Sequence, residues 1–278
     1  MAVDLTKPPR IIVVHGVRLG SGASIDCAGA VERLLRQALS RVHVERPFET
    51  RQYVFEDLNN DAQEVAQMVS GAILRSRPIA RKALEKAIDL VGDVVIAAAN
   101  TSTAALIRDG LRNKVLEAHD EGHQVVLVAH SLGTVYSLDV VSELLGDAEL
   151  CSGDDSRLWP VSALLTLGSP LGLNLKVGRW RLFDKRLVQP VPSSHELFPW
   201  HNFFNRQDPV VSGRVFGTRV NVKGADGPLE RRYRQDTGGA GWLLQPHVVT
   251  SGAKWLLAHT SYWKHHTVGA CLANTIWG

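Results

Sequence analysis

The sequence predicts an α/β fold with a mostly parallel sheet and helices on both faces. Residues 11–14 form a short, wholly apolar run that ends in His-Gly, which is typical of a strand buried on both faces. A helical pattern over 26–40 and a strand pattern over 48–55 follow, in the strand–helix–strand order of a parallel sheet. Later, the strong strand pattern at 124–129 leads directly into a helical pattern at 134–145. Together these segments predict one parallel sheet with crossover helices.

The rest of the chain fills in this framework. Residues 59–121 contain no good strand pattern, so we expect an insertion of two or more helices, the last of them over 104–119. The remaining expected elements are strands at 161–167, 200–205 and 219–223, a loop insert at 171–198, a Gly-rich loop at 237–241, and helices at 248–257 and 264–276. We expect residues 1–278 to form a single domain.

Charge and hydropathy argue against a nucleic-acid partner and against a membrane-spanning segment. The formal net charge of +3 is too small to indicate a nucleic-acid partner. The segment 88–107 is apolar but carries Asp89, Asp93 and Asn100, so it makes a poor membrane span. The first ten residues lack the pattern of a signal peptide, and we expect a cytoplasmic protein, with secretion by a signal-free route left open.

The three cysteines, Cys27, Cys151 and Cys271, are too few and too scattered to predict a disulfide framework or a zinc site. They suit a reducing compartment. No Gly-rich phosphate loop or metal-ligand spacing is visible in the sequence. We therefore expect neither a cofactor nor a metal.

Ser131 is the candidate nucleophile. A serine hydroxyl is a weak nucleophile that needs an adjacent base, an orienting carboxylate and backbone N–H groups aimed at the developing oxyanion. One known solution places the serine on a tight strand-to-helix turn flanked by small residues. The segment 129–133, Ala-His-Ser-Leu-Gly, matches this pattern between a buried strand and a helix, with Ala129 in place of the usual first Gly. A chance serine in such a turn is the alternative, and His130 is expected to line the site.

The oxyanion donors are expected at two strand ends. The backbone N–H of Leu132 lies at the start of a helix, where free N–H groups favour negative charge. The second donor is expected in the loop after residues 11–14, where Gly16 allows a close backbone approach and the N–H of Val17 is the candidate. His15 is expected to line the site beside Gly16. Alone, Val-His-Gly could be any tight strand end.

Chain order selects the acid and the base. In this arrangement the order is serine, then Asp or Glu, then His, each at the carboxyl end of a strand. Asp208 follows the aromatic strand at 200–205 and precedes a proline, which favours it; a simple Asp-Pro turn is the alternative. His195 and His201 precede Asp208, so chain order disfavours them. His259 is expected in a loop just before the closing helix, where the base of this arrangement usually lies, and is the expected base, with His247 second. The acidic residues passed over lie in a helix, a polar loop or the insert: Asp139, Glu143, Asp147, Asp154, Asp155, Asp184 and Glu196.

These residues resemble those of a known family. Val-His-Gly at 14–16, Ala-His-Ser-Leu-Gly-Thr-Val at 129–135 and Leu-Gly-Ser-Pro at 167–170 are similar to segments of the lipase-like α/β-hydrolases, including the group related to GPI-inositol deacylases. So are the spaced residues Trp200, Asn202, Asp208-Pro-Val and His259-x-x-Tyr-Trp. The resemblance consists of short matching segments distributed over nearly the whole chain. It implies the α/β-hydrolase fold, Ser131 as nucleophile, Asp208 as acid, His259 as base, and hydrolysis of carboxylic esters.

The chain departs from that family in two ways. Ala129 replaces a glycine, and no strand pair precedes residue 11, which predicts a trimmed sheet that begins at the usual third strand. A thioesterase, amidase or acyltransferase would use the same residues, and a non-catalytic ligand- or protein-binding scaffold is the alternative of another class. The expected partner is a small-molecule or lipid ester.

Two segments bear on the substrate. The apolar stretch 94–99 is expected to pack between helices, with a cover over an acyl pocket as the alternative. Basic residues surround Trp180 and Phe183 within 176–186. We expect a solvated loop there, with contact to an anionic membrane surface or head group as the alternative. The oligomeric state is left open by the sequence.

Overall fold

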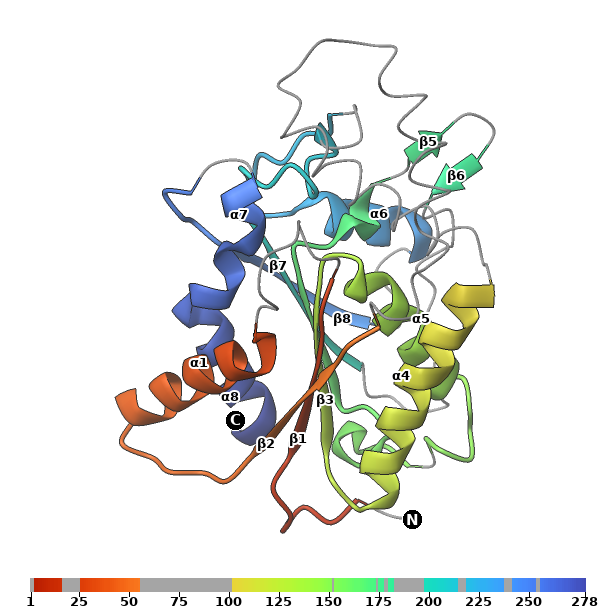
Figure 1. Ribbon diagram of the computed structural model, residues 1–278, viewed down its shortest axis with the longest axis vertical. Helices are drawn as coiled ribbons and strands as arrows, with labels where there is room; N and C mark the ends of the chain where they lie inside the picture. The colour runs from red at the N-terminus through yellow and green to blue at the C-terminus, as the bar shows by residue number, and fades with distance from the viewer. Residues whose placement is uncertain are drawn as a thin grey trace.

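The computed structural model describes residues 3–16, 26–55, 102–151, 153–173, 175–177, 180–182, 198–214, 219–237, 242–253 and 256–278 (Figure 1). Six of its strands form one parallel sheet in the order β2-β1-β3-β4-β7-β8. Their bounds are Arg10–Val14 (β1), Glu49–Tyr53 (β2), Val125–His130 (β3), Ala163–Leu167 (β4), Phe198–Phe204 (β7) and Trp242–Val248 (β8). Two further strands, β5 (Leu175–Val177) and β6 (Trp180–Leu182), form a separate antiparallel pair.

Helices cover both faces of the sheet, as Figure 1 shows. On one face α1 (Cys27–Arg41) packs against α8 (His266–Trp277), and on the other α4 (Ser102–Asp120) packs against α5 (Gly133–Leu145). The shorter helices are α6 (Pro228–Thr237) and α7 (Leu256–Thr260), with 3-10 turns at Ser156–Leu158, Pro170–Gly172 and Ser261–Lys264. The layers are therefore helix, sheet, helix.

The central strands are apolar throughout because both of their faces are buried. Along β1, Ile11 and Val13 join the core beneath α1 and α8, whereas Ile12 and Val14 join the core beneath α4 and α5. Successive side chains of a strand point to opposite faces, so a continuous apolar run supplies both cores. Gly269 of α8 allows this helix to pack closely against α1. A Cβ at Gly269 would lie 2.2 Å from the Leu34 carbonyl oxygen of α1.

The structure confirms the α/β class and the parallel sheet, with β2 and β8 at the edges of the six strands. It contradicts two expected elements. Residues 219–223 are irregular, not a strand. The described residues 248–253 are not helical: β8 continues to Val248, residues 249–253 are irregular, and α7 begins at Leu256.

Some predicted elements lie outside the described residues. Of the expected insertion 59–121, α4 is described and matches the helix expected at 104–119, while the stretch 94–99 is not described. Within the expected loop insert, only the backbone of β5 and β6 is described between 174 and 197. Among the helices that are described, none has the length and hydrophobicity needed to cross a bilayer.

Candidate active site

Ser131 stands on a strained turn between β3 and α5. Its φ is +54°, a left-handed conformation that residues other than glycine adopt rarely. The Ser131 N–H donates to the Leu167 carbonyl (3.0 Å), and the Ser131 carbonyl accepts from the hydroxyl of Thr134 (2.6 Å). Backbone strain of this kind costs about 1–3 kcal/mol and persists only where the surroundings impose it. The turn thus carries the geometry expected of a nucleophile elbow.

Two glycines allow the strands to approach this turn closely. A Cβ at Gly16 would lie 2.5 Å from Ser131 Cβ and 2.9 Å from the His130 carbonyl oxygen. A Cβ at Gly133 would lie 2.7 Å from the carbonyl oxygens of both Val14 and His15. Real Cβ atoms do not come this close, so the end of β1 and the start of α5 require glycine at both positions.

Ala129 replaces glycine without disturbing the elbow. It pairs with Val14 of β1 on one side and Thr166 of β4 on the other. It is fully buried in the core beneath α4 and α5, where its methyl group packs among apolar side chains. The departure from the usual motif is therefore sterically accommodated.

Asp208 and His259 form a buried pair next to the elbow. His259 Nδ1–H donates to Asp208 Oδ2 at 2.8 Å, and the two residues are 1% and 0% exposed. The other carboxylate oxygen, Oδ1, accepts from the backbone N–H of Val210 (2.8 Å). With Nδ1–H donating to the carboxylate, Nε2 is the ring nitrogen left to accept a proton. His259 lies within the short helix α7, not in the loop expected there.

Tyr262 supports the acid from the next turn of the chain. Its hydroxyl donates to Asp208 Oδ2 (2.7 Å) and accepts from the backbone N–H of Asn205 (2.9 Å). Burial, followed by the Asp208 charge, raises the pKa of the Tyr262 phenol well above its usual value. The phenol therefore stays protonated and remains a donor to the carboxylate.

Gly168 provides the space in which this group packs. Its φ is +60°, and a Cβ there would lie 2.7 Å from Tyr262 Cε2, 2.9 Å from Asp208 Oδ2 and 3.0 Å from His259 Nδ1. Gly168 directly follows Leu167, whose carbonyl holds Ser131. The end of β4 therefore touches both the elbow and the acid–base pair.

His130 positions the backbone of His259. Its Nε2–H donates to the His259 carbonyl at 2.8 Å, and the two rings lie 4.6 Å apart between centroids. Burial lowers the pKa of His130 well below its usual value, and the neighbouring His259 and His15 lower it further. His130 is thus a neutral donor to the backbone of His259.

Three buried polar atoms at this site have no hydrogen-bond partner within the described part of the chain: Ser131 Oγ, His259 Nε2 and His130 Nδ1. An unpaired buried polar group costs about 1–3 kcal/mol, so such groups call for an explanation. The unpaired hydroxyl and the unpaired imidazole nitrogen are the two atoms that nucleophilic catalysis would use.

The expected residues divide into three groups. Ser131, Leu132, Gly16, His15, His130, Asp208 and His259 all lie at this end of the sheet. Val17, the second oxyanion candidate, lies outside the described residues. His247, the second choice of base, lies on β8, where its Nε2 is 3.1 Å from His201 Nδ1. Sequence reasoning gave no role to Tyr262 or Gly168, although both lie in the recognised segments 259–263 and 167–170.

A six-stranded parallel sheet, covered by helices on both faces and carrying a serine on a left-handed strand-to-helix turn, defines the α/β-hydrolase fold. No family model matches the chain, and no curated protein does. Solved structures are similar at low identity. A Xanthomonas campestris pv. campestris protein assigned to the hydrolases of the α/β superfamily is 15% identical, with 96% of this chain and 98% of that chain covered and a TM-score of 0.42.

Two other solved structures are similar. TT1662 from Thermus thermophilus is 15% identical over 98% of this chain and 90% of its own, with a TM-score of 0.43. The Pyrococcus furiosus esterase Pf2001 is 11% identical over 99% and 84%, with a TM-score of 0.38. Similarities of this size assign neither activity nor substrate to the present chain.

Proposed function

We propose that this protein is a serine hydrolase that cleaves carboxylic esters, with Ser131 as nucleophile, His259 as base and Asp208 as the orienting acid. One observation carries the proposal: a buried, unpaired serine hydroxyl on a φ +54° turn lies at the same strand ends as a buried Asp–His pair whose Nε2 is also unpaired. A purely structural serine would not require a strained backbone and an unsatisfied hydroxyl together.

In the first half-reaction, His259 Nε2 takes the proton of Ser131 Oγ as that oxygen attacks the ester carbonyl carbon. The tetrahedral intermediate then expels the alcohol, which receives the proton from Nε2, and an acyl-Ser131 ester remains. Water repeats the sequence, with Nε2 as base and then acid, releasing the carboxylic acid and restoring the serine. Asp208 holds the Nδ1–H of His259 and stabilises the transient imidazolium.

The oxyanion of the intermediate needs backbone donors. The N–H of Leu132 precedes α5, where the first N–H groups of a helix lack intrahelical acceptors and the helix dipole favours negative charge. We assign the second donor to Val17, directly after Gly16. A Cβ at Gly16 would lie 3.2 Å from Ser131 Oγ, so the residue directly before Val17 lies beside the nucleophile.

The test is active-site labelling with a fluorophosphonate. The wild type and Ser137→Ala should label stoichiometrically, and Ser131→Ala should not. Ser137 is a matched control because its hydroxyl is also buried in α5 and unpaired among the described residues. If Ser131→Ala labels like the wild type, or if the folded wild type does not label, the serine hydrolase proposal is wrong.

Substrate class is a separate measurement. A panel of p-nitrophenyl esters of graded chain length, with matched thioesters and anilides, separates an esterase from a thioesterase or amidase that uses the same residues. We expect ester cleavage to be fastest. Sedimentation with anionic and neutral vesicles tests peripheral contact with a lipid surface.

A further inference from the structure

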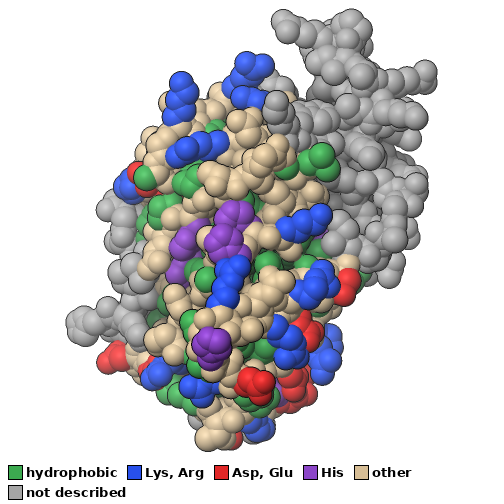
Figure 2. Space-filling model, turned by 90° about the vertical axis from the view of Figure 1, so that its left-hand side faces the viewer, with side chains coloured by type: hydrophobic (Ala, Val, Ile, Leu, Met, Phe, Trp, Pro, Cys, Tyr) green, Lys and Arg blue, Asp and Glu red, His purple; other side chains and the backbone are tan. Residues whose placement is uncertain are grey.

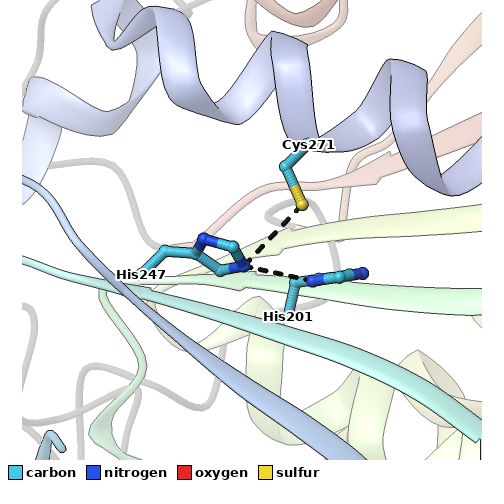
Figure 3. Close-up of side chains that lie close together, drawn as sticks. All are labelled: His201, His247 and Cys271. Atoms are coloured by element: carbon cyan, nitrogen blue, oxygen red, sulfur yellow. Dashed lines mark hydrogen bonds between the residues drawn. The ribbon is translucent and has the colours of Figure 1, made fainter. Parts of the chain in front are cut away.

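Three side chains with metal-binding atoms meet on the face of the sheet covered by α8. They are His201 on β7, His247 on β8 and Cys271 on α8 (Figure 3). His247 Nε2 lies 3.1 Å from His201 Nδ1 and 3.8 Å from Cys271 Sγ, and all three ligand atoms lie within 4.8 Å of one another. None of these residues takes part in the proposed hydrolytic chemistry.

The fold itself creates this arrangement. In the parallel register His201 pairs with Gln245 and Phe203 pairs with His247, so the two histidines sit two positions apart in register on one face of adjacent strands. The His247 ring also stacks on Phe203, with centroids 4.4 Å apart and planes 12° apart, which fixes its orientation. Cys271 reaches the pair from the helix above.

Thr275, one helical turn after Cys271, sets the tautomer of His201. The Thr275 hydroxyl donates to the Cys271 carbonyl (2.9 Å), so toward His201 its oxygen is an acceptor. His201 Nε2 lies 3.1 Å from that oxygen and therefore carries the proton. The lone pair of neutral His201 is then on Nδ1, the atom that faces His247 and Cys271. Metal-bound histidines in proteins are oriented by a hydrogen bond of this kind on the other ring nitrogen.

We propose that His201, His247 and Cys271 bind a divalent ion of the zinc class, with the fourth tetrahedral position left to water. Two imidazoles and a thiolate are ligands that zinc favours, and three protein ligands with one open position form a known type of site. Bond lengths of about 2.0–2.3 Å place the ligand atoms of a tetrahedral zinc ion roughly 3.3–3.7 Å apart. The distances of 3.1 and 3.8 Å already approximate this spacing. The third pair, His201 and Cys271, lies within 4.8 Å, and movement of the Cys271 side chain would close it.

The protonation states of the three side chains are compatible with binding a metal ion. Burial, followed by the neighbouring His247, lowers the pKa of His201 to about 4, and burial also lowers the pKa of His247. Both imidazoles are therefore neutral at pH 7. Burial raises the pKa of the Cys271 thiol to about 11, so the thiol is protonated until a metal displaces its proton. Binding should release about one proton per metal ion and should strengthen as the pH rises.

A metal here would join the last two strands of the sheet to the closing helix. β7 leads to Asp208, and α8 follows directly on the segment that carries His259 and Tyr262. The ion would therefore stabilise the frame that carries the acid and the base without contacting them. This inference does not depend on the proposed function, and its test does not use hydrolytic activity.

The experiment is a Co²⁺ titration of the metal-free, untagged full-length protein, followed by displacement with Zn²⁺. Surface histidines are the competing binders: histidine side chains gather on the face seen in Figure 2, and the rings of His265 and His266 stack with centroids 5.2 Å apart. The stacked histidines include no thiol, and Cys27 and Cys151 are buried, so a thiolate-to-cobalt charge-transfer band with tetrahedral visible bands identifies the proposed site. His266→Ala, which alters an exposed imidazole, is the matched control.

We expect one Co²⁺ per chain in the wild type and in His266→Ala, with the charge-transfer band in both. Cys271→Ser should lose the band, and Thr275→Val should weaken binding about 10–100-fold because it frees the His201 ring. Zn²⁺ should raise the melting temperature of the wild type but not of Cys271→Ser.

A measurement on the wild type alone covers the case in which the variants fail to fold. Bound Zn²⁺ should protect Cys271, the half-buried cysteine, from a thiol reagent; Cys27 and Cys151 are buried. The proposal is wrong if the wild type shows no thiolate band, if Zn²⁺ gives no protection, or if binding survives Cys271→Ser and is lost in His266→Ala.

Discussion

Gly168→Ala tests whether the end of β4 sets the geometry of the acid–base pair. The added Cβ would lie 2.9 Å from Asp208 Oδ2 and 3.0 Å from His259 Nδ1, whereas ordinary contacts begin at 3.4 Å. Relief requires the pair to move by about 0.5 Å, and displacements approaching 1 Å can cost about a hundredfold in rate. We therefore expect kcat on a p-nitrophenyl ester to fall roughly 10–100-fold.

The same substitution should also reduce the free energy of unfolding. Overpacking costs about 1–3 kcal/mol, and placing a side chain at φ +60° adds about 1–2 kcal/mol. Gly122→Ala is the matched control: its φ is +84°, but a Cβ there meets Lys7 Nζ at 3.5 Å, an ordinary contact. It should lose only the backbone contribution and keep full kcat. If folded Gly168→Ala retains kcat within about twofold of the wild type, the reasoning fails.

Three further predictions concern strain, support and pH. Tyr262→Phe removes a donor to Asp208 and leaves the buried N–H of Asn205 unpaired, so the free energy of unfolding in urea should fall by about 2–4 kcal/mol. A smaller loss than 1 kcal/mol would contradict the bonding described. Because φ at Ser131 is +54°, Ser131→Gly should be about 1 kcal/mol more stable than Ser131→Ala by the same assay; equal stabilities would argue against strain at the elbow. His201, with a pKa of about 4, stays neutral in the folded chain while the unfolded chain takes up its proton below about pH 6.5. Stability in the presence of a chelator should therefore fall between pH 6.5 and 4, by up to about 1.4 kcal/mol per pH unit from this group, and His201→Gln should flatten that slope.

The sequence predicts the strands that are buried on both faces and the edge strand β2, but not β8 at the opposite edge. The runs in β1 and β3 are wholly apolar because each supplies two cores, which makes them unmistakable. Among the described strands, β8 pairs with β7 alone. It contains Pro246 and carries the polar residues Gln245 and His247, all of which an edge strand tolerates. Its pattern therefore resembles a loop. No helix was expected at α6, which reaches the expected Gly-rich loop only at residue 237. Its polar, Arg-rich sequence shows little of the apolar periodicity that predicts a helix.

The parts of the candidate site that could be predicted are those that lie close together in the sequence or follow the chain order of the fold. Ser131 and its flanking residues form a local motif, so its strained turn could be anticipated from five consecutive residues. Asp208 and His259 were chosen by chain order, and the structure brings them within hydrogen-bond distance. Gly168 could not be given a role in this way. Its need for glycine comes from side chains 40 and 91 positions later in the chain, which only the packing of α7 onto the strand ends brings together.

Chain order gives no indication that His201 and His247 lie close together in the structure. His201 was set aside as a base because it precedes Asp208, and His247 was kept as the second choice because it follows. The structure gives both a different partner: the register of β7 and β8 places them two positions apart on one face of the sheet, and α8 adds Cys271. Separations of 46 and 24 residues leave no short-range ligand spacing to recognise. The sequence therefore lacks metal ligands at short-range spacing only. In a parallel sheet, long crossovers join neighbouring strands, so ligands on adjacent strands lie far apart in the chain.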